Sequence, residues 1–174
     1  MKILSILPLC LLLLACQGKK STSKDNIPND EAIEYSWIEN AASAKSWLVD
    51  AIETTFKEKE GDNPEIFNKN YFAYKSDAIG VGYDGGMDEQ TFTDKWKKDF
   101  DCKYSGMGTG FLISGQDWST IKVTKCNLIS SEKDQDFIFD VIIHDEAANF
   151  DYKRKIYVRS EKEQFLIRDV LEFN

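Results

Sequence analysis

Four side chains near the ends of predicted strands have the chemistry for acid–base catalysis. His144 is the only histidine in the chain; Asp145 follows it directly, and Asp140 precedes it on the same predicted strand. Asp169 falls on a later strand that can lie beside this one. An imidazole held by a carboxylate can act as a general base, so these residues are candidates for a hydrolase or an isomerase. The alternative is a partly exposed histidine at a strand end, with Asp145 in the following turn.

The first sixteen residues are typical of an exported lipoprotein. After Lys2, an apolar run too short to cross a bilayer ends in Leu13-Leu14-Ala15-Cys16. This ending resembles the bacterial lipobox, whose cysteine is lipidated and becomes the mature N-terminus. The resemblance implies a signal peptide over residues 1–15, a lipid on Cys16 and a flexible tether over residues 16–31. A buried hydrophobic helix or a plain secretory signal is the alternative.

The residue after the lipidated cysteine bears on location. Gln17 stands where lipoproteins retained at the inner membrane often carry aspartate, so the pattern resembles that of lipoproteins sent to the outer membrane. We therefore expect a lipid anchor in the outer membrane with the domain facing the periplasm. In that oxidising compartment Cys102 and Cys126 can form one disulfide, which would stabilise the fold by about 3 kcal/mol, or remain two buried thiols.

The charge balance restricts the partners. The chain has 22 basic and 30 acidic side chains and a net charge of −8. Such a balance argues against nucleic acid and against a domain lying flat on anionic lipid, and it weakly suggests a cationic partner. With one histidine and no calcium-loop pattern, the sequence predicts no metal site. Gly80, Gly82 and Gly85 match a dinucleotide-binding motif literally but lack its βαβ context, so we expect a turn and no cofactor.

Periodicity predicts one α+β domain over residues 32–174, with N-terminal helices packed on a curved antiparallel sheet of four to five strands. An amphipathic helix is expected over residues 32–60, a short helix from Pro64 to about Tyr71, and a third helix over residues 88–100. Five extended segments follow, over residues 104–114, 120–129, 137–144, 152–159 and 165–173.

Side-chain alternation refines these segments. Phe137, Phe139, Val141 and Ile143 share one face of their strand and are expected in the core. In the first segment, Gly106, Gly108 and Gly110 would all point to one face, which suggests close helix packing or an open groove. Tyr152, Arg154, Tyr157 and Arg159 suggest a polar strand face that is solvated or used for cross-strand pairing.

Three further residues are candidates for binding. Trp118 and Asp117 follow Gly115 at a predicted hairpin, where an aromatic ring beside a carboxylate can hold a peptide or a sugar. The other interpretation is a tryptophan folded back over the edge of the sheet. Tyr83 lies in the glycine-rich loop at residues 80–86 and is the third candidate.

The order of helices and strands resembles the NTF2-like, cystatin-like superfamily. The best local match is Phe165-Leu166-Ile167-Arg168-Asp169-Val170-Leu171, which is similar to the terminal strand of many such domains. The segments Thr91–Trp96 and Phe111–Trp118 resemble uncharacterised envelope lipoproteins of Bacteroidetes. Because this superfamily hosts enzymes, binding proteins and adaptors, the resemblance implies a fold but no activity.

Taken together, these features predict a membrane-anchored envelope lipoprotein with a non-catalytic domain. That domain would bind a small ligand or an envelope protein in a pocket or on a docking surface. One alternative is an envelope hydrolase or isomerase using His144. A second alternative is an inhibitor or immunity-type protein whose acidic surface blocks a basic partner.

Overall fold

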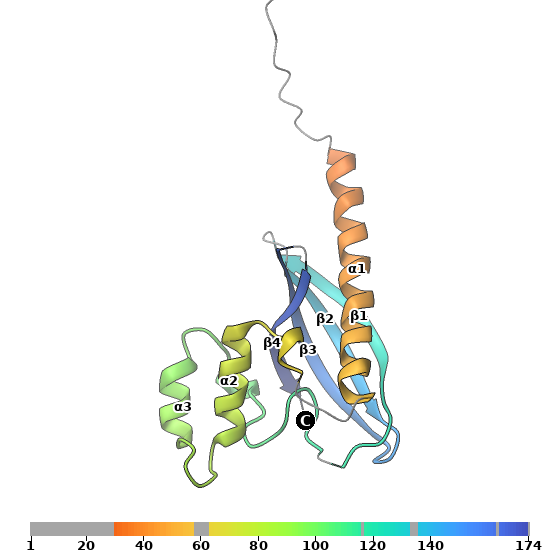
Figure 1. Cartoon of the computed structure of the whole chain (residues 1–174). Helices are drawn as coiled ribbons and strands as arrows, with labels where there is room; N and C mark the ends of the chain where they lie inside the picture. The colour runs from red at the N-terminus through yellow and green to blue at the C-terminus, as the bar shows by residue number, and fades with distance from the viewer. Residues whose placement is uncertain (1–29, 58–62, 116, 133–135, 163, 174) are drawn as a thin grey trace, which may run out of the picture.

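The computed structural model describes residues 30–57, 63–115, 117–132, 136–162 and 164–173, and it has the predicted α+β class. Within these ranges, three α-helices and two short 3₁₀ helices precede four strands, which form one antiparallel sheet (Figure 1). The signal peptide, Cys16 and the tether up to residue 29 lie outside the described residues. No helix in the described part of the chain is both long and apolar enough to cross a membrane.

The first helix, α1 (Asp30–Lys57), agrees closely with the predicted range of 32–60. Apolar side chains at four-residue steps put one face of α1 on the sheet, and Ala44, Leu48 and Ile52 are completely buried there. Ile38 belongs to the same apolar series but is 51% exposed. The reason is visible in Figure 1, where the N-terminal part of α1 extends beyond the sheet.

The short helix predicted from Pro64 to Tyr71 is wrong in extent. Asn63 and Pro64 do start a helical turn, but it is only the 3₁₀ helix η1 (Pro64–Ile66). A new helix, α2 (Lys69–Gly80), follows, and the Asn68 side chain caps it by accepting a hydrogen bond from the Asn70 amide. Sequence reasoning missed α2 because its buried residues are large and aromatic, which favours an extended assignment when no partner is known.

The third helix, α3 (Glu89–Trp96), is shorter than predicted and is capped by Asp88. Phe92 and Trp96 of this helix are buried and belong to the core. Phe100 lies beyond the helix end and stacks on Tyr74, with ring centroids 4.1 Å apart. The glycine-rich loop between α2 and α3 is a tight turn, as expected, since Gly82 and Gly85 both have positive φ.

The sheet consists of β1 (Ile121–Glu132), β2 (Asp136–Asp145), β3 (Phe150–Glu161) and β4 (Gln164–Phe173), paired in chain order. These are the last four predicted segments, so their assignment is confirmed. The expected core face of β2 is also confirmed, because Phe137, Phe139, Val141 and Ile143 are all buried.

The predicted strand over residues 104–114 is wrong. This region contains the 3₁₀ helix η2 (Cys102–Tyr104) and then irregular backbone. Gly106 and Gly108 have φ values of 59° and 71°, which a strand cannot accommodate, so the glycines do not line one face. A Cβ atom on Gly106 would lie 2.3 Å from a carboxylate oxygen of Glu172, and the glycine therefore allows close backbone approach.

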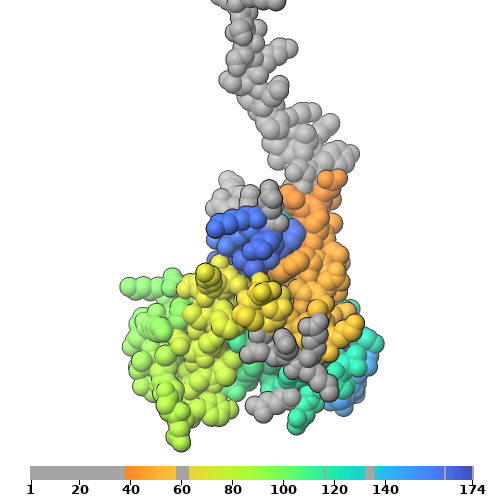
Figure 2. Space-filling view, in the orientation of Figure 1, coloured from red at the N-terminus to blue at the C-terminus, as the bar shows by residue number. Residues whose placement is uncertain are grey.

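The helices lie on one face of the sheet. α1 packs mainly on β1, and α2 packs beside β4. The edge of β4 is also contacted by η1. Just after η1, the Asn68 amide donates a hydrogen bond to the Ile167 carbonyl of β4. Figure 2 shows the side chains of α1, α2 and α3 filling most of this side of the molecule. No α-helix among the described residues covers the opposite face of the sheet; at its β4 edge, Tyr104 of η2 packs on Phe173, with ring centroids 4.9 Å apart.

Candidate binding surface

The histidine lies at the end of β2, but its partner is not one of the predicted carboxylates. His144 faces Asp151 across the β2–β3 pair, and its Nδ1 atom is 2.8 Å from Asp151 Oδ1. The side chains of His144 and Asp151 are 27% and 54% exposed, respectively. A histidine that contacts a carboxylate in open solvent agrees with the strand-end interpretation rather than with an enclosed general base.

The three predicted carboxylates have other roles. Asp140 forms an ion pair with Lys125, at 2.5 Å from Nζ to Oδ2. Asp145 is the last residue of β2 and not part of the turn as one interpretation had it; it is buried and accepts hydrogen bonds from the amides of Ala147 and Ala148 in the turn that follows. Asp169 lies on β4, and burial raises its pKa to about 6. None of the three forms a hydrogen bond with His144.

The predicted binding residues are not gathered into one site. Trp118 is folded back onto the protein, which agrees with the alternative to a binding role. Its Nε1 donates a hydrogen bond to the Phe56 carbonyl at 3.3 Å, and its ring lies edge-on to the Phe56 ring. Asp117 is exposed on the loop before β1. Tyr83 is 62% exposed on the turn between α2 and α3. None of these residues lines the pocket described below.

Cys102 and Cys126 are both buried and both free, so the predicted disulfide is absent. The topology explains why. Cys126 is on β1, whereas Cys102 begins η2, which packs against β4 at the other edge of the sheet. Strands are spaced by about 4.8 Å, so the two edges are roughly 14 Å apart, well beyond the Cα separation of a disulfide.

The two thiols should resist modification in the native protein. Burial raises the pKa of both, that of Cys126 to about 11, so little reactive thiolate forms at neutral pH. We expect a maleimide to label neither thiol in the folded chain and both in denaturant without reductant, as read by peptide mass mapping. A denatured, unreduced protein that takes no label at these positions would establish a disulfide instead.

The uncovered side of the sheet is the strongest candidate for a binding surface. We call it the open face; it is made of cross-strand neighbours, which project to the same side of an antiparallel sheet. Its members on β2 and β3 are Ile138, Asp140, Ile142, His144, Asp151, Lys153, Lys155 and Tyr157. Its flanking members on β1 and β4 are Lys122, Lys125, Asn127, Ser130, Asp169, Leu171 and Phe173.

Apolar side chains occupy the centre of the open face. Ile138 is only 7% exposed even though no helix covers it, because its neighbours on the face shield it. Ile142, Tyr157 and Leu171 are partly buried in the same way. An apolar centre surrounded by charged side chains is the usual composition of a protein-binding surface.

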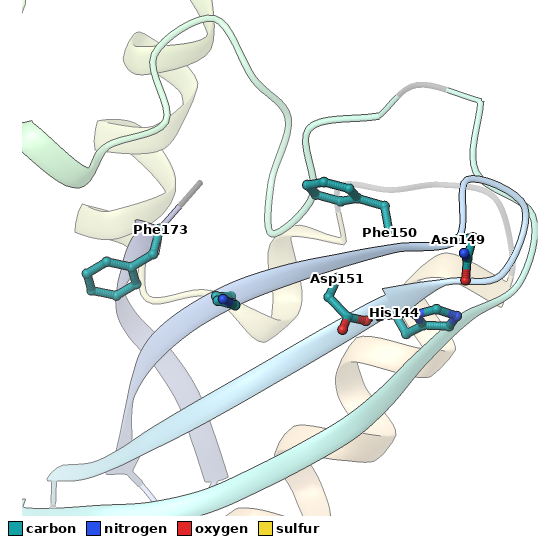
Figure 3. A pocket seen from close by; sticks show the side chains of 6 residues that line it. His144, Asn149, Phe150, Asp151 and Phe173 are labelled. Atoms are coloured by element: carbon teal, nitrogen blue, oxygen red, sulfur yellow. Dashed lines mark hydrogen bonds and ion pairs between the residues drawn. The ribbon is translucent and has the colours of Figure 1, made fainter.

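An open pocket of about 600 Å³ lies at one end of this face. Its lining combines aromatic, cationic and polar groups: His144, Asn149, Phe150, Asp151, Lys153 and Phe173. Figure 3 shows Phe173 at one end of the pocket, with Asn149 and the His144–Asp151 pair at the other, and α1 behind the strands. Phe150 is 49% exposed, which is unusual for a side chain of this size.

Two lysines of the open face lack an acidic partner. Lys125 pairs with Asp140, and Lys122 pairs with Glu146. Lys153 and Lys155, by contrast, form no ion pair with any residue that the structure describes. They sit at alternate positions of β3, so both project from the open face.

A buried ionic cluster, which sequence reasoning missed, supports the strands from the other side. Glu172 on β4 receives Lys75 from α2, at 2.5 Å from Nζ to Oε1, and Arg154 from β3, at 3.2 Å from Nη2 to Oε2. All three side chains are almost fully buried. Burial lowers the pKa of Lys75, and Glu172 opposes that shift.

The cluster is connected to the pocket through the backbone. Arg154 and Glu172 face each other in the β3–β4 register and immediately adjoin the pocket residues Lys153 and Phe173. Arg154 also donates from Nε to the Leu112 carbonyl at 2.8 Å, which holds the loop after η2 against the sheet. The cluster therefore fixes the strand segment that presents the pocket. Its only signal in the sequence is charged residues at core-facing positions.

The described residues contain no group of three or more histidine, cysteine, aspartate or glutamate side chains arranged to hold a metal ion. No known family model matches the chain, no characterised protein matches its sequence, and no solved structure matches its fold. The functional argument therefore depends on the geometry of the chain itself.

Proposed function

We propose that this chain is a non-catalytic binding module of the bacterial cell envelope, which holds a partner on the open face of its sheet. The observation that supports the proposal is the one-sided packing of the sheet. Helices cover one face, whereas the other carries a partly buried apolar centre and an open pocket whose lining includes Lys153 and Phe173. Apolar area left on one face of a sheet is a common basis for association.

The geometry favours this function over catalysis. A general base works best where water is excluded, because low dielectric strengthens its interactions with the reacting groups. The His144–Asp151 pair is open to solvent on both sides of its hydrogen bond. The pocket beside the pair is also open, so the hydrolase or isomerase alternative has no enclosed site here.

The inhibitor or immunity-type alternative receives less support. It requires an acidic surface that covers a basic partner. The largest candidate surface instead presents the unpaired Lys153 and Lys155. Binding to a basic partner would then have to use another part of the molecule.

A cross-linking experiment tests the proposed surface. A photoreactive amino acid at Leu171 on the open face is expected to yield a discrete protein adduct in cells that express the full chain. The matched position Gln90, exposed on α3, should yield none. Adding Ile142→Asp should abolish the Leu171 adduct, because it places a charge in the apolar centre. An adduct at Gln90 alone, or no adduct at Leu171, would refute the proposal.

We also propose that Cys16 carries the lipid that anchors the domain, with the tether holding it away from an outer membrane on the periplasmic side. The expectation comes from the lipobox-like ending of the first sixteen residues. Cys16→Ser should shift the protein from the membrane fraction to the soluble fraction, and mass spectrometry of the native protein should find acyl chains on Cys16. Membrane retention of the serine variant would contradict the anchor.

A further inference from the structure

We infer that the partner held on the open face is an acidic segment of a protein, in extended conformation, that places an apolar side chain in the pocket beside Phe173. This inference deepens the proposed function and depends on it. It names the chemistry of the partner, which the one-sided packing of the sheet leaves open.

The first argument is the distribution of charge. The whole chain has a net charge of −8, so most of its surface repels an acidic partner. On the open face, Lys122 and Lys125 pair with Glu146 and Asp140, whereas Lys153 and Lys155 form no ion pair with any described residue; Asp140 lies across from Lys155, and Asp151 lies two residues from Lys153 on the same face. Two cations without an ion pair on an otherwise acidic molecule would direct an acidic segment to this face and set its orientation.

The second argument is spacing. Lys153 and Lys155 are two residues apart on β3, so their Cα atoms lie about 6.6 Å apart. Carboxylates at alternate positions of an extended segment have the same spacing and project to one side. Such a segment running along β3 can therefore pair both lysines at once.

The pocket supplies an apolar contact. Lys153 and its cross-strand neighbour Phe173 both line the pocket, so a carboxylate on Lys153 brings the adjoining part of the ligand over the Phe173 ring. Covering this partly exposed ring would remove apolar surface from water. The pocket thus favours a segment that combines acidic residues with a large apolar side chain.

An anionic membrane surface fits these observations less well. Asp140 and Asp151 stand among the lysines of the open face, and Glu146 lies beside it. A lipid surface would press against all of these carboxylates, as well as against the acidic chain as a whole. A narrow peptide segment along β3 lies over fewer of these carboxylates than a lipid surface does.

Two matched synthetic decapeptides test the inference on the isotope-labelled full chain by NMR. Both carry one phenylalanine; one has glutamate at alternate positions and the other has lysine there. The glutamate peptide is expected to shift the resonances of Lys153, Lys155 and Phe173. Its affinity should fall roughly tenfold between 50 and 300 mM salt, since the contacts are charged and exposed.

Charge reversal provides the specific control. K153E/K155E should weaken the glutamate peptide at least about tenfold and favour the lysine peptide. The charge-matched variant K69E/K98E changes two exposed lysines away from the open face, one at the start of α2 and one in the turn after α3, and should leave binding nearly unchanged. Equal losses from both variants would mean that only net charge matters, which would overturn the inference.

The remaining outcomes separate the inference from the proposed function. Equal binding of both peptides at the open face overturns the acidic partner but leaves the binding surface intact. Shifts of the same resonances by phosphatidylglycerol vesicles, without binding of the glutamate peptide, would replace the protein partner by a lipid surface. Absence of peptide binding overturns the inference in every case, and the Leu171 cross-link then decides whether the proposed function fails as well.

Discussion

Replacing Glu172 by glutamine is expected to lower the free energy of unfolding by about 3–5 kcal/mol. Glu172 is the only carboxylate in the buried cluster with Lys75 and Arg154, and the side chains of all three are at most 1% exposed. The glutamine variant keeps the shape of the side chain but leaves two buried cations without a counter-charge. Urea denaturation of the full chain measures the loss.

The cluster should also behave as a unit. Lys75→Met in the Glu172→Gln background removes one of the two uncompensated cations. The double variant should therefore lose less stability than the sum of the single variants, by about 1–3 kcal/mol. Additive effects would show that Lys75 and Glu172 do not interact in the folded protein.

The surface pair Lys125–Asp140 provides the matched control. Its distance is also 2.5 Å, but its side chains are 40% and 46% exposed. Asp140→Asn is expected to change stability by no more than about 1 kcal/mol, because water compensates for the lost ion pair. A loss of this small size for Glu172→Gln would contradict the role assigned to the buried cluster.

Replacing Asp169 by asparagine is expected to stabilise the protein at neutral pH by about 2–3 kcal/mol. Burial raises the pKa of Asp169 from 3.8 to about 6, and Asp101 raises it further, while the Val170 amide and Arg168 oppose the shift. At pH 7 the folded protein therefore holds a carboxylate in an unfavourable environment, and each pKa unit corresponds to about 1.4 kcal/mol. Asparagine keeps the size and removes the charge.

The pH dependence gives this prediction a specific signature. Between pH 3.8 and about 6 the folded state binds more protons at Asp169 than the unfolded state does, so ionisation lowers stability as the pH rises through this range. Below pH 3.8 the carboxyl is neutral in both states and contributes no difference. The gain from Asp169→Asn should be near zero at pH 4 and reach its full size by pH 7. A gain that does not depend on pH would point to packing instead of charge.

Several elements of this fold follow from local patterns. The four-residue apolar steps of Leu48, Ile52 and Phe56 specify a helix that packs on one side, and α1 has that form. The alternation in β2 specifies which side chains enter the core. Both predictions succeeded because helix and strand periodicity express burial on one face directly.

Other predictions failed because they required knowledge of distant segments. The region at 104–114 has a strand-like composition, but Gly106 is held at positive φ where the backbone meets Glu172. Tyr71 and Tyr74 have β propensity, yet they lie on α2 because stacking with Phe92, Phe100 and other rings favours the helix. Tertiary contacts outweigh propensities of a few tenths of a kcal/mol per residue.

The candidate site likewise combines features set by local sequence patterns with features set by contacts between distant segments. The sequence by itself determined the α+β class, the long first helix, the last four strands, the acidic charge and the lone histidine at a strand end. Only the tertiary structure decided that Arg154 is buried, that Cys102 and Cys126 lie at opposite edges of the sheet, and that Lys153 and Lys155 form no ion pair with the described residues. The reason is that burial and pairing of charges depend on strand register and helix placement, which bring together residues that no local pattern connects.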